Sequence, residues 1–370
     1  LGIDPAALRE KNLLKEGMLM PAYYNETANA CALDKCLEHC KEIFDWDARY
    51  PVRNLGNGKV RAAGMAMAMQ GSCISNVDVG GATIKLNDDG SYNLMIAAAD
   101  MGTGCDTILA QMAAETLECS PDMVNVFGAD TDASPYDSCS YASSTTYVTG
   151  RAVVMACEQL IENMKAIAAE IKGVSKDDTD FVGTGVRILT TGEKVSLFDI
   201  ASKSMLFNNI PVAVTQTNTQ PVSPPPFMVG MAEIELDPGT GKVEVTDYAA
   251  VVDCGTVINR NLAAVQTEGG IAQGIGMALS ESITYNEKGK ILENSFMQYK
   301  IPARVDVGRI NVDFESSYEP TGPFGAKSIG EIVINTPSPA INAAIAAASG
   351  SWHYELPITP EKVLMAMKEQ

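Results

Sequence analysis

A carboxylate follows a glycine-bearing loop near the C-terminal end of the chain. The run from Gly325 to Gly330 leads directly to Glu331, and the residues around this glutamate are small or apolar. A carboxylate in such surroundings can accept a proton near neutral pH and serve as a general base. Most glutamates at the end of a loop are merely solvated, so a catalytic Glu331 competes with a plain surface residue.

The loop Gly102-Thr103-Gly104 is a second candidate, because it runs directly into a predicted helix. Glycines at a helix start leave backbone N–H groups exposed, and such groups can bind phosphate. The spacing fits neither the dinucleotide-binding fingerprint nor the P-loop. A plain turn before a helix explains this loop more often than an anion site does.

Small hydroxyl residues gather from Ser138 to Thr146, at the beginning of another predicted helix. Short side chains let a polar ligand approach the backbone closely. An ordinary capping cluster explains such a run at least as often, since serine and threonine hydroxyls bond readily to nearby backbone groups. The sequence chemistry leaves both interpretations open.

A glutamine precedes a run of glycines within a predicted helix. Gln266 is followed by Gly269, Gly270, Gly274 and Gly276. Each glycine inside a helix costs about 1 kcal/mol relative to alanine, so several together indicate that something packs very closely against this helix. A neighbouring helix and a bound ligand would both account for them.

Histidine and cysteine give little support to a metal site made of side chains. His39 and His353 are the only histidines, so a catalytic triad or a His-ligated metal would depend on one of these two residues. Cys36 and Cys40 share one face of a predicted helix, where core packing explains them best. We therefore expect no metal ligands from side chains, and chemistry that uses a carboxylate or a cofactor with its own metal ligands.

Composition narrows the class of protein. A chain of 370 residues with 46% hydrophobic and 20% charged residues has enough apolar material for two lobes. A formal net charge of −19 without a basic stripe argues against nucleic acid as a partner. No apolar stretch approaches the roughly 20 residues that cross a bilayer, so we expect no membrane partner and a cytoplasmic protein.

The order of predicted elements indicates an α+β fold of two lobes with mixed sheets and helices, because strands and helices do not alternate regularly. A polar and then proline-rich stretch over 184–226 is interpreted as a crossing between the lobes. We expect a helical connector over 1–58, a first lobe over 59–220 and a second lobe over 221–370. Helices are predicted near 5–13, 33–46, 105–117, 143–172, 260–281, 339–348 and 360–368, strands within 59–101 and near 124–127 and 310–314, and hairpin turns at 87–90, 237–241 and 286–289.

These segments, in this order, resemble the molybdenum-cofactor domain of the xanthine dehydrogenase and aldehyde oxidase family. The resemblance covers nearly the whole chain and corresponds to the C-terminal half of the family's molybdenum-binding subunit. The segments are specific together, although each one alone is not. The runs that carry the resemblance are Gly2–Pro5, Arg9–Leu14, Met101–Gly104, Ala142–Thr146, Gln266–Gly276 and Gly325–Glu331.

The resemblance implies a role for each candidate. In the family a pyranopterin holds the molybdenum, which agrees with the lack of side-chain metal ligands. Glu331 stands at the position of the family's base, and Gln266 matches a glutamine that hydrogen-bonds near the metal. The pterin and its phosphates would contact Gly102, Thr103, Gly104, Ala142, Ser143, Ser144 and Thr145.

The resemblance also implies an activity and partners. The enzyme would be a molybdopterin-dependent oxidoreductase that uses water to hydroxylate an electron-poor carbon of a purine, a related N-heterocycle or an aldehyde. Its molybdopterin is expected in the cytosine dinucleotide form, with iron–sulfur clusters and FAD on partner subunits or domains. The N-terminal half of the molybdenum-binding subunit would complete the site. We therefore expect this chain to be inactive alone and the assembled complex to be a dimer.

Three positions depart from the family pattern. Thr103 stands where many members have glutamine, Tyr141 interrupts the small-residue run, and Ile332 follows the glutamate where proline is common. The first departure removes a side-chain contact from the Gly102 loop, and the other two would reshape the pocket.

Two further hypotheses remain from the sequence. The chain could be a non-catalytic scaffold subunit that keeps the family fold, although a scaffold has no need to retain Glu331 and Gln266. It could also be a nucleotide-binding protein that uses the Gly102 loop, although the P-loop lysine and the dinucleotide-binding spacing are missing.

Overall fold

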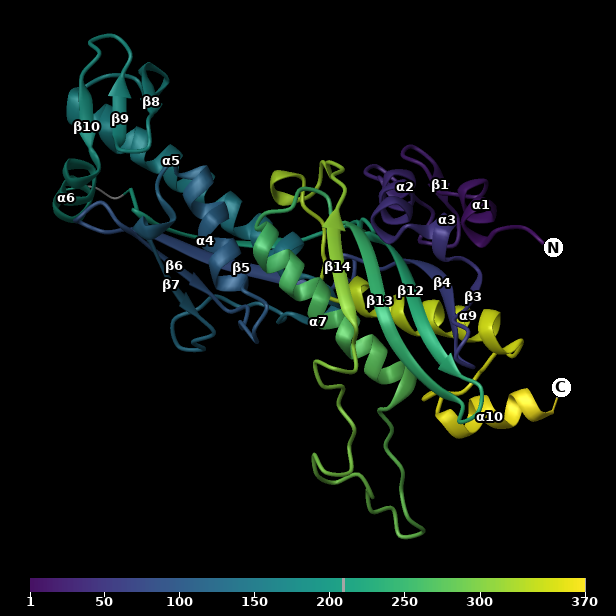
Figure 1. The fold of residues 1–370 in the computed structure, drawn as a ribbon. Helices are drawn as coiled ribbons and strands as arrows, with labels where there is room; N and C mark the ends of the chain where they lie inside the picture. The colour runs from purple at the N-terminus through teal and green to yellow at the C-terminus, as the bar shows by residue number, and fades with distance from the viewer. Residues whose placement is uncertain (208–209, 370) are drawn as a thin grey trace. The chain divides into compact units, whose positions relative to one another are not determined.

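The chain folds into two compact units, and neither is one continuous stretch of sequence. The computed structural model describes residues 1–207 and 210–369. Helices and strands mix in both units without regular alternation, which confirms the α+β prediction (Figure 1). Unit 1 comprises residues 1–70, 224–318 and 329–370, and unit 2 comprises residues 71–223 and 319–328.

One strand explains why these units differ from the consecutive segments expected at 1–58, 59–220 and 221–370. β4 (Val60–Met69) pairs antiparallel along its length with β12 (Phe227–Asp237). A strand expected in the first lobe thus belongs to unit 1, because its hydrogen-bond partners lie beyond the proline-rich run. Local periodicity indicates a strand but does not say which distant strand it pairs with.

Unit 1 is built on a five-stranded sheet in the order β14-β13-β12-β4-β3. β12 and β13 (Lys242–Asp253) form the predicted hairpin around residues 237–241. β14 (Arg309–Phe314) lies parallel to β13, and the connection between these two strands contains α7 (Arg260–Leu279). A parallel pair requires such a crossover. The edge strand β3 spans Val52–Asn54.

Helices cover both faces of this sheet. Met228 of β12 faces a core formed with α7 and α9 (Pro337–Ser349), while its neighbour Val229 faces a second core formed with α2 (Leu33–Phe44). Successive side chains of a strand point to opposite faces, so a strand covered on both sides is apolar throughout. This explains the continuous apolar run at the start of β12.

The helix predicted over 33–46 is shorter than expected. Asp45 takes a left-handed conformation with φ +59°, which ends α2 and starts the separate turn α3 (Trp46–Arg49). Cys36 and Cys40 are fully buried on α2 in the second core. Core packing of the two thiols is therefore confirmed.

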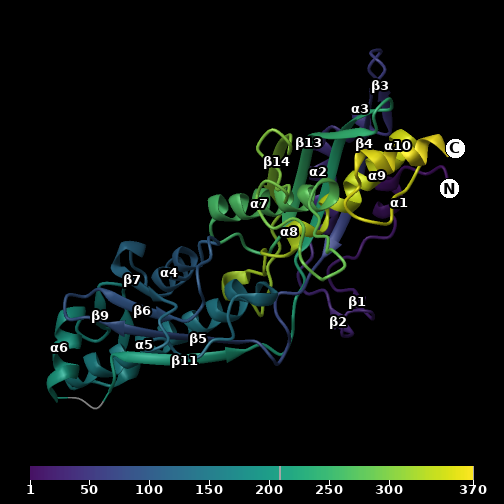
Figure 2. The same ribbon diagram turned by 90° about the horizontal axis from the view of Figure 1, so that it is seen from below.

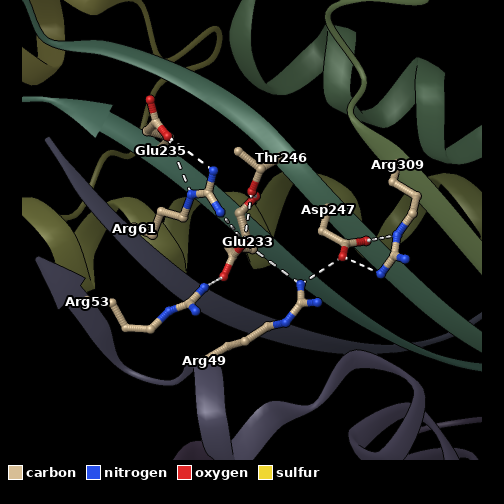
Figure 3. Close-up of polar contacts among 8 residues, drawn as sticks. All are labelled: Arg49, Arg53, Arg61, Glu233, Glu235, Thr246, Asp247 and Arg309. Carbon is tan, nitrogen blue, oxygen red and sulfur yellow. Dashed lines mark hydrogen bonds and ion pairs between the residues drawn. The ribbon is translucent and has the colours of Figure 1, made fainter. Parts of the chain in front are cut away.

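Ion pairs join the N-terminal segment to the sheet (Figure 3). Arg49 of α3 donates to Asp247 at 2.7 Å, and Arg53 of β3 pairs with Glu233. Both carboxylates are buried, and Arg309 of β14 donates to Asp247 at 2.7 Å from the other side. These ion pairs connect α3 and β3 to β12 and β13. The first 58 residues are therefore integral to unit 1.

Unit 2 contains a four-stranded sheet in the order β11-β5-β6-β7. β5 (Val79–Leu86) and β6 (Tyr92–Ile96) form a hairpin, as the turn at 87–90 predicts. β7 (Val124–Gly128) runs parallel to β6 after α4 (Cys105–Thr116). Helices α4 and α5 pack against this sheet and against each other (Figure 2).

The helix predicted over 143–172 begins later than expected. Ala142 and Ser143 have left-handed backbone angles, and a π-helical turn occupies Thr145–Thr149. Regular α-helix starts only with α5 (Gly150–Lys172). The hydroxyl-rich run is therefore irregular backbone, a form that recurs at functional sites.

The polar stretch over 184–226 contains more structure than expected. It includes the strands β9 (Gly185–Ile188), β10 (Lys194–Ser196) and β11 (Ala213–Thr219) and the helix α6 (Leu197–Phe207). Among the described residues, none of the helices has the length and apolarity that crossing a bilayer requires.

The remaining elements are α1 (Pro5–Glu10), β1 (Leu19–Met20), β2 (Glu26–Thr27), β8 (Thr179–Phe181), α8 (Ile332–Asn335) and α10 (Pro360–Lys368).

Candidate functional site

Glu331 lies at the start of α8 in unit 1, with an exposed side chain. The Nε2 of Gln70 donates a hydrogen bond to its Oε2 at 2.7 Å. Gln70 directly follows β4, and its own backbone N–H reaches the carbonyl of Pro226 at 3.4 Å. The sheet therefore anchors the residue that orients this carboxylate, while the carboxylate itself stays accessible to water.

The glycines of α7 are explained by close helix packing. A Cβ at Gly270 would lie 2.2 Å from Cγ2 of Val333 on α8, and a Cβ at Gly274 would lie 2.7 Å from Cγ of Pro337 on α9. Of the two explanations open from the sequence, the neighbouring helix accounts for these two glycines. The absence of side chains lets α7 approach the segment that begins at Glu331.

Gln266 lies on the same face of α7 as these two glycines. Positions 266, 270 and 274 are four residues apart, and residues four apart share one face of an α-helix. The Gln266 side chain is half-buried. Unit 1 thus brings two of the predicted site residues, Gln266 and Glu331, onto elements that pack against each other.

Backbone N–H groups of the Gly102 loop in unit 2 already bind a carboxylate of the same chain. Oδ1 of Asp100 accepts the backbone N–H of Gly102 at 2.9 Å and of Gly104 at 3.1 Å. Burial raises the pKa of Asp100, but the N–H groups of Gly104, Gly102, Asp106 and Thr103 lower it more, so the pKa lies below its ordinary value. The sequence suggested a phosphate at these amides, whereas in the structure a carboxylate uses two of them.

Two further titratable groups, Cys105 and Asp106, lie close to Asp100 in this loop. Burial, and then the charge of Asp100, raise the pKa of Asp106 at the first turn of α4. Burial raises the pKa of the Cys105 thiol to about 11, so this thiol is protonated at neutral pH. The ligand atoms of Asp100, Cys105 and Asp106 lie within 4.8 Å of one another. Two carboxylates and a protonated thiol thus stand together beside the backbone N–H groups of the loop.

The run Ala142–Thr145 combines sharply turned backbone with one buried hydroxyl. Ala142 has φ +50° and Ser143 has φ +58°, a conformation that turns the backbone sharply. Ser144 donates its hydroxyl to the carbonyl of Cys139 at 3.3 Å. Thr145 Oγ1 is buried, and no other described residue provides it with a hydrogen-bond partner. A buried hydroxyl without a partner costs free energy unless a ligand or water satisfies it.

The predicted residues divide between the units. Gln266 and Glu331 belong to unit 1, and the loops at 102–104 and 142–145 belong to unit 2.

Two residues that contact the predicted site residues, Asp100 and Gln70, were not identified from the sequence. Asp100 has a local signal, because aspartate two residues before a glycine often accepts the loop's N–H groups. Gln70 has none, because its contact with Glu331 spans 261 positions.

Comparisons with known proteins agree with this reading of the fold. Residues 39–308 match the family described as molybdopterin cofactor-binding domain. The chain is 35% identical over 348 residues to the probable hypoxanthine oxidase XdhD of Escherichia coli K12, covering 93% of the chain and 36% of that protein. It is 30% identical to the putative xanthine dehydrogenase molybdenum-binding subunit XdhA of the same organism, covering 98% of the chain and 49% of that protein.

A solved structure has the same fold. Quinoline 2-oxidoreductase from Pseudomonas putida 86 superposes with a TM-score of 0.88 at 22% identity, covering all of this chain and 50% of that one. The chain thus spans between about a third and a half of the length of these relatives. The family match covers most of the chain, and the two Escherichia coli relatives align with 93% and 98% of it. The chain belongs to the molybdenum-binding subunits of the xanthine dehydrogenase and aldehyde oxidase family.

Proposed function

We propose that the chain is part of a molybdenum hydroxylase that acts on a purine, a related N-heterocycle or an aldehyde. Three of its relatives are named for enzymes of hypoxanthine, xanthine and quinoline, which are N-heterocycles, and this supports the substrate class. The net reaction replaces a C–H bond by C–OH, with oxygen from water and release of two protons and two electrons. Because the chain spans half or less of its relatives, the rest of the subunit is needed for activity.

Glu331 is the proposed base, and its hydrogen bond with Gln70 is the observation that carries this role. The amide holds one carboxylate oxygen at 2.7 Å, which restricts how the side chain can turn. Its exposure leaves the carboxylate able to take a proton from water during the reaction. A lysine or arginine partner would neutralise the charge of the carboxylate. The amide of Gln70 is uncharged, so it orients the carboxylate and leaves its negative charge in place.

The loops of unit 2 and α7 of unit 1 supply the proposed cofactor contacts. When bound, the molybdenum cofactor would supply the centre that accepts two electrons from the substrate. Thr145 offers a buried hydroxyl that needs a partner, and the Asp100 cluster beside Gly102, Thr103 and Gly104 would accept from the N–H edge of the pterin. The other proposed contacts are Ala142, Ser143, Ser144 and Gln266.

The remaining parts of the assembly are proposed from the family. The pterin carries a cytosine dinucleotide, and electrons leave through iron–sulfur clusters and FAD on partner subunits or domains. The N-terminal half of the molybdenum-binding subunit completes the site, and the complete assembly is a cytoplasmic dimer.

Replacing the base tests the proposal. In the complete assembly, Glu331→Gln should lower kcat by at least about a hundredfold, because general-base catalysis contributes roughly that much or more. Molybdenum content, measured by metal analysis, should stay at about one per molybdenum-binding subunit. Glu355→Gln is the control, since Glu355 is a highly exposed carboxylate of the same unit. Near-normal turnover of Glu331→Gln would reject the assigned base, and an intact assembly without molybdenum would favour the scaffold hypothesis.

A further inference from the structure

A long arm leaves the body of unit 1 between α7 and β14. We define the arm as residues 281–306, which contain one isolated β-bridge, Tyr285 with Ile291, around the predicted turn at 286–289. Figure 1 shows this segment as an extended loop that projects beyond the sheet and helices of its unit. A loop of this length without helix or long strand usually has a binding role or is disordered.

Large apolar side chains of the arm point into solvent. Phe296 is 87% exposed, Met297 is 81% exposed and Val305 is 89% exposed. None of the arm's apolar residues belongs to a buried core cluster of the described chain. An apolar patch of this kind marks an interaction surface. The other large exposed apolar residues of the arm are Ile283, Tyr285, Ile291, Leu292 and Ile301.

Hydrogen bonds within the arm fix its shape. The carboxylate of Glu293 accepts both the backbone N–H and the hydroxyl of Thr284, each at 2.7 Å. The hydroxyl of Tyr299 donates to Oε2 of Glu281 at 2.5 Å, which ties the two sides of the arm together at its base. Polar groups thus bond to one another while apolar groups face outward. Such a preformed surface loses less conformational entropy on binding than a disordered loop.

The base of the arm is also seated against α7. A Cβ at Gly276 would lie 2.0 Å from Oε1 of Glu281 and 2.8 Å from Cδ of Pro302. Gly276, the last glycine of the α7 run, is therefore explained by the arm rather than by another helix. Both ends of the arm are held by the helix that carries Gln266.

The charge of the arm does not oppose docking onto an acidic protein. Four basic and four acidic residues give the arm a formal net charge of zero, although the whole chain carries −19. A second copy of the chain would bring its own charge of −19 close to the arm, so charge does not favour a second copy as the partner of this surface. The basic residues are Lys288, Lys290, Lys300 and Arg304, and the acidic residues are Glu281, Glu287, Glu293 and Asp306.

The lengths of the relatives indicate what covers the arm. In quinoline 2-oxidoreductase, a single chain contains this fold and as much sequence again. We propose that the arm is a docking surface for that other half of the molybdenum-binding subunit, with Phe296 and Met297 as its central contacts. This inference rests on the proposed function and adds to it the place where the two halves join.

Photo-crosslinking in the recombinant molybdenum-containing assembly tests the arm. With p-benzoylphenylalanine in place of Phe296, irradiation should join the arm to a peptide of the other half, identified by mass spectrometry. The same residue in place of Phe198, which is exposed on α6 of unit 2, is the control and should not join that peptide. A crosslink from position 296 to a second copy, to an iron–sulfur or FAD subunit, or to nothing would overturn the proposal.

Proteolysis gives a second readout. Chymotrypsin should cut the isolated chain at the arm at least tenfold faster than it cuts the assembly, because docking would cover Phe296. Equal rates would overturn the proposal. Molybdenum is measured in the same preparation. An assembly that protects the arm but contains no molybdenum would count against the proposed function alone, and a molybdenum-containing assembly with an unprotected arm would count against the docking surface alone.

Discussion

At the scale of single residues, the candidate base is defined by its partner. Glu331 follows a glycine-bearing loop, as many solvated glutamates do, and its distinguishing feature is the amide of Gln70 at 2.7 Å. A hydrogen bond to a charged group contributes about 1.5–3 kcal/mol when it is well formed, and less when it is exposed to water. The pair therefore positions the carboxylate and is not a main source of stability.

Removing the partner amide should slow turnover without emptying the site. In the complete assembly, Gln70→Ala should lower kcat by about tenfold, because the carboxylate loses the donor that restricts its orientation. KM and molybdenum content should change little. Gln159→Ala removes an exposed glutamine of α5 and serves as the control. A fall in molybdenum content that matched the fall in kcat would show that Gln70 acts on cofactor retention instead.

His353 should make unit 1 less stable in mild acid. Burial, and then the charge of Lys362, lower the pKa of His353 below its ordinary value of 6.5. The unfolded chain then binds more protons than the folded chain near pH 6.5, so stability rises with pH and is lost as pH falls through the unfolded pKa. The midpoint of urea unfolding should fall from pH 7.5 to pH 5.5 more steeply for the native chain than for His353→Gln. Parallel pH profiles would contradict this.

At the scale of elements, the packing of α7 requires glycine at some of its glycine positions and not at others. Gly270 faces Val333 at a distance that leaves no room for a methyl group. At Gly269, one position earlier, a Cβ would have no described atom within 4 Å apart from its chain neighbours and the adjacent backbone of α7. These two glycines therefore provide a matched pair for measuring how closely α7 and α8 approach.

Alanine should have opposite effects at the two positions. Gly269→Ala should raise the free energy of unfolding by about 0.5–1 kcal/mol, because it restricts the unfolded chain and favours the helix. Gly270→Ala should lower it by about 1–3 kcal/mol, because the new methyl group would overlap Val333. Urea unfolding of the isolated chain measures both. Stabilisation by Gly270→Ala would show that α8 moves easily away from α7.

At the scale of the whole molecule, the chain contains two compact units, and the two stretches of unit 2 interrupt the sequence of unit 1 at residues 71–223 and 319–328. The two tryptophans, Trp46 and Trp352, both belong to unit 1. Tryptophan fluorescence therefore reports the unfolding of unit 1, while far-UV circular dichroism reports both units. Proteins with more than one core commonly depart from two-state unfolding.

Substitutions in each unit should separate the two transitions. Gly64→Ala would place a methyl group 2.3 Å from the backbone of α9 in unit 1, and Gly80→Ala would place one 2.6 Å from the backbone of Thr149 in unit 2. Each should lower the stability of its own unit by about 1–3 kcal/mol. The fluorescence midpoint should fall for Gly64→Ala and stay unchanged for Gly80→Ala. Equal shifts for both variants would show that the units unfold as one.

The sequence by itself determined the local features. The turn at 87–90, the start of α4 after Gly104 and the hairpin around 237–241 follow from glycine placement and residue periodicity, which act over a few positions. The family followed from several short motifs in a fixed order, and the match of residues 39–308 to the molybdopterin cofactor-binding domain family confirmed the family. Helix ends were less certain, as Asp45 and the π-helical turn before α5 show.

Only the tertiary structure decided which distant groups meet. Gln70 reaches Glu331 across 261 positions because β4 pairs with a strand beyond the proline-rich run. Asp100 accepts hydrogen bonds from backbone N–H groups that the sequence had suggested for a ligand. Val333 packs where a side chain at position 270 would lie, which explains the glycine there. Periodicity and turn chemistry fix backbone shape within a segment. Strand pairing and side-chain competition for the same donors depend on the whole chain, so they become visible only in three dimensions.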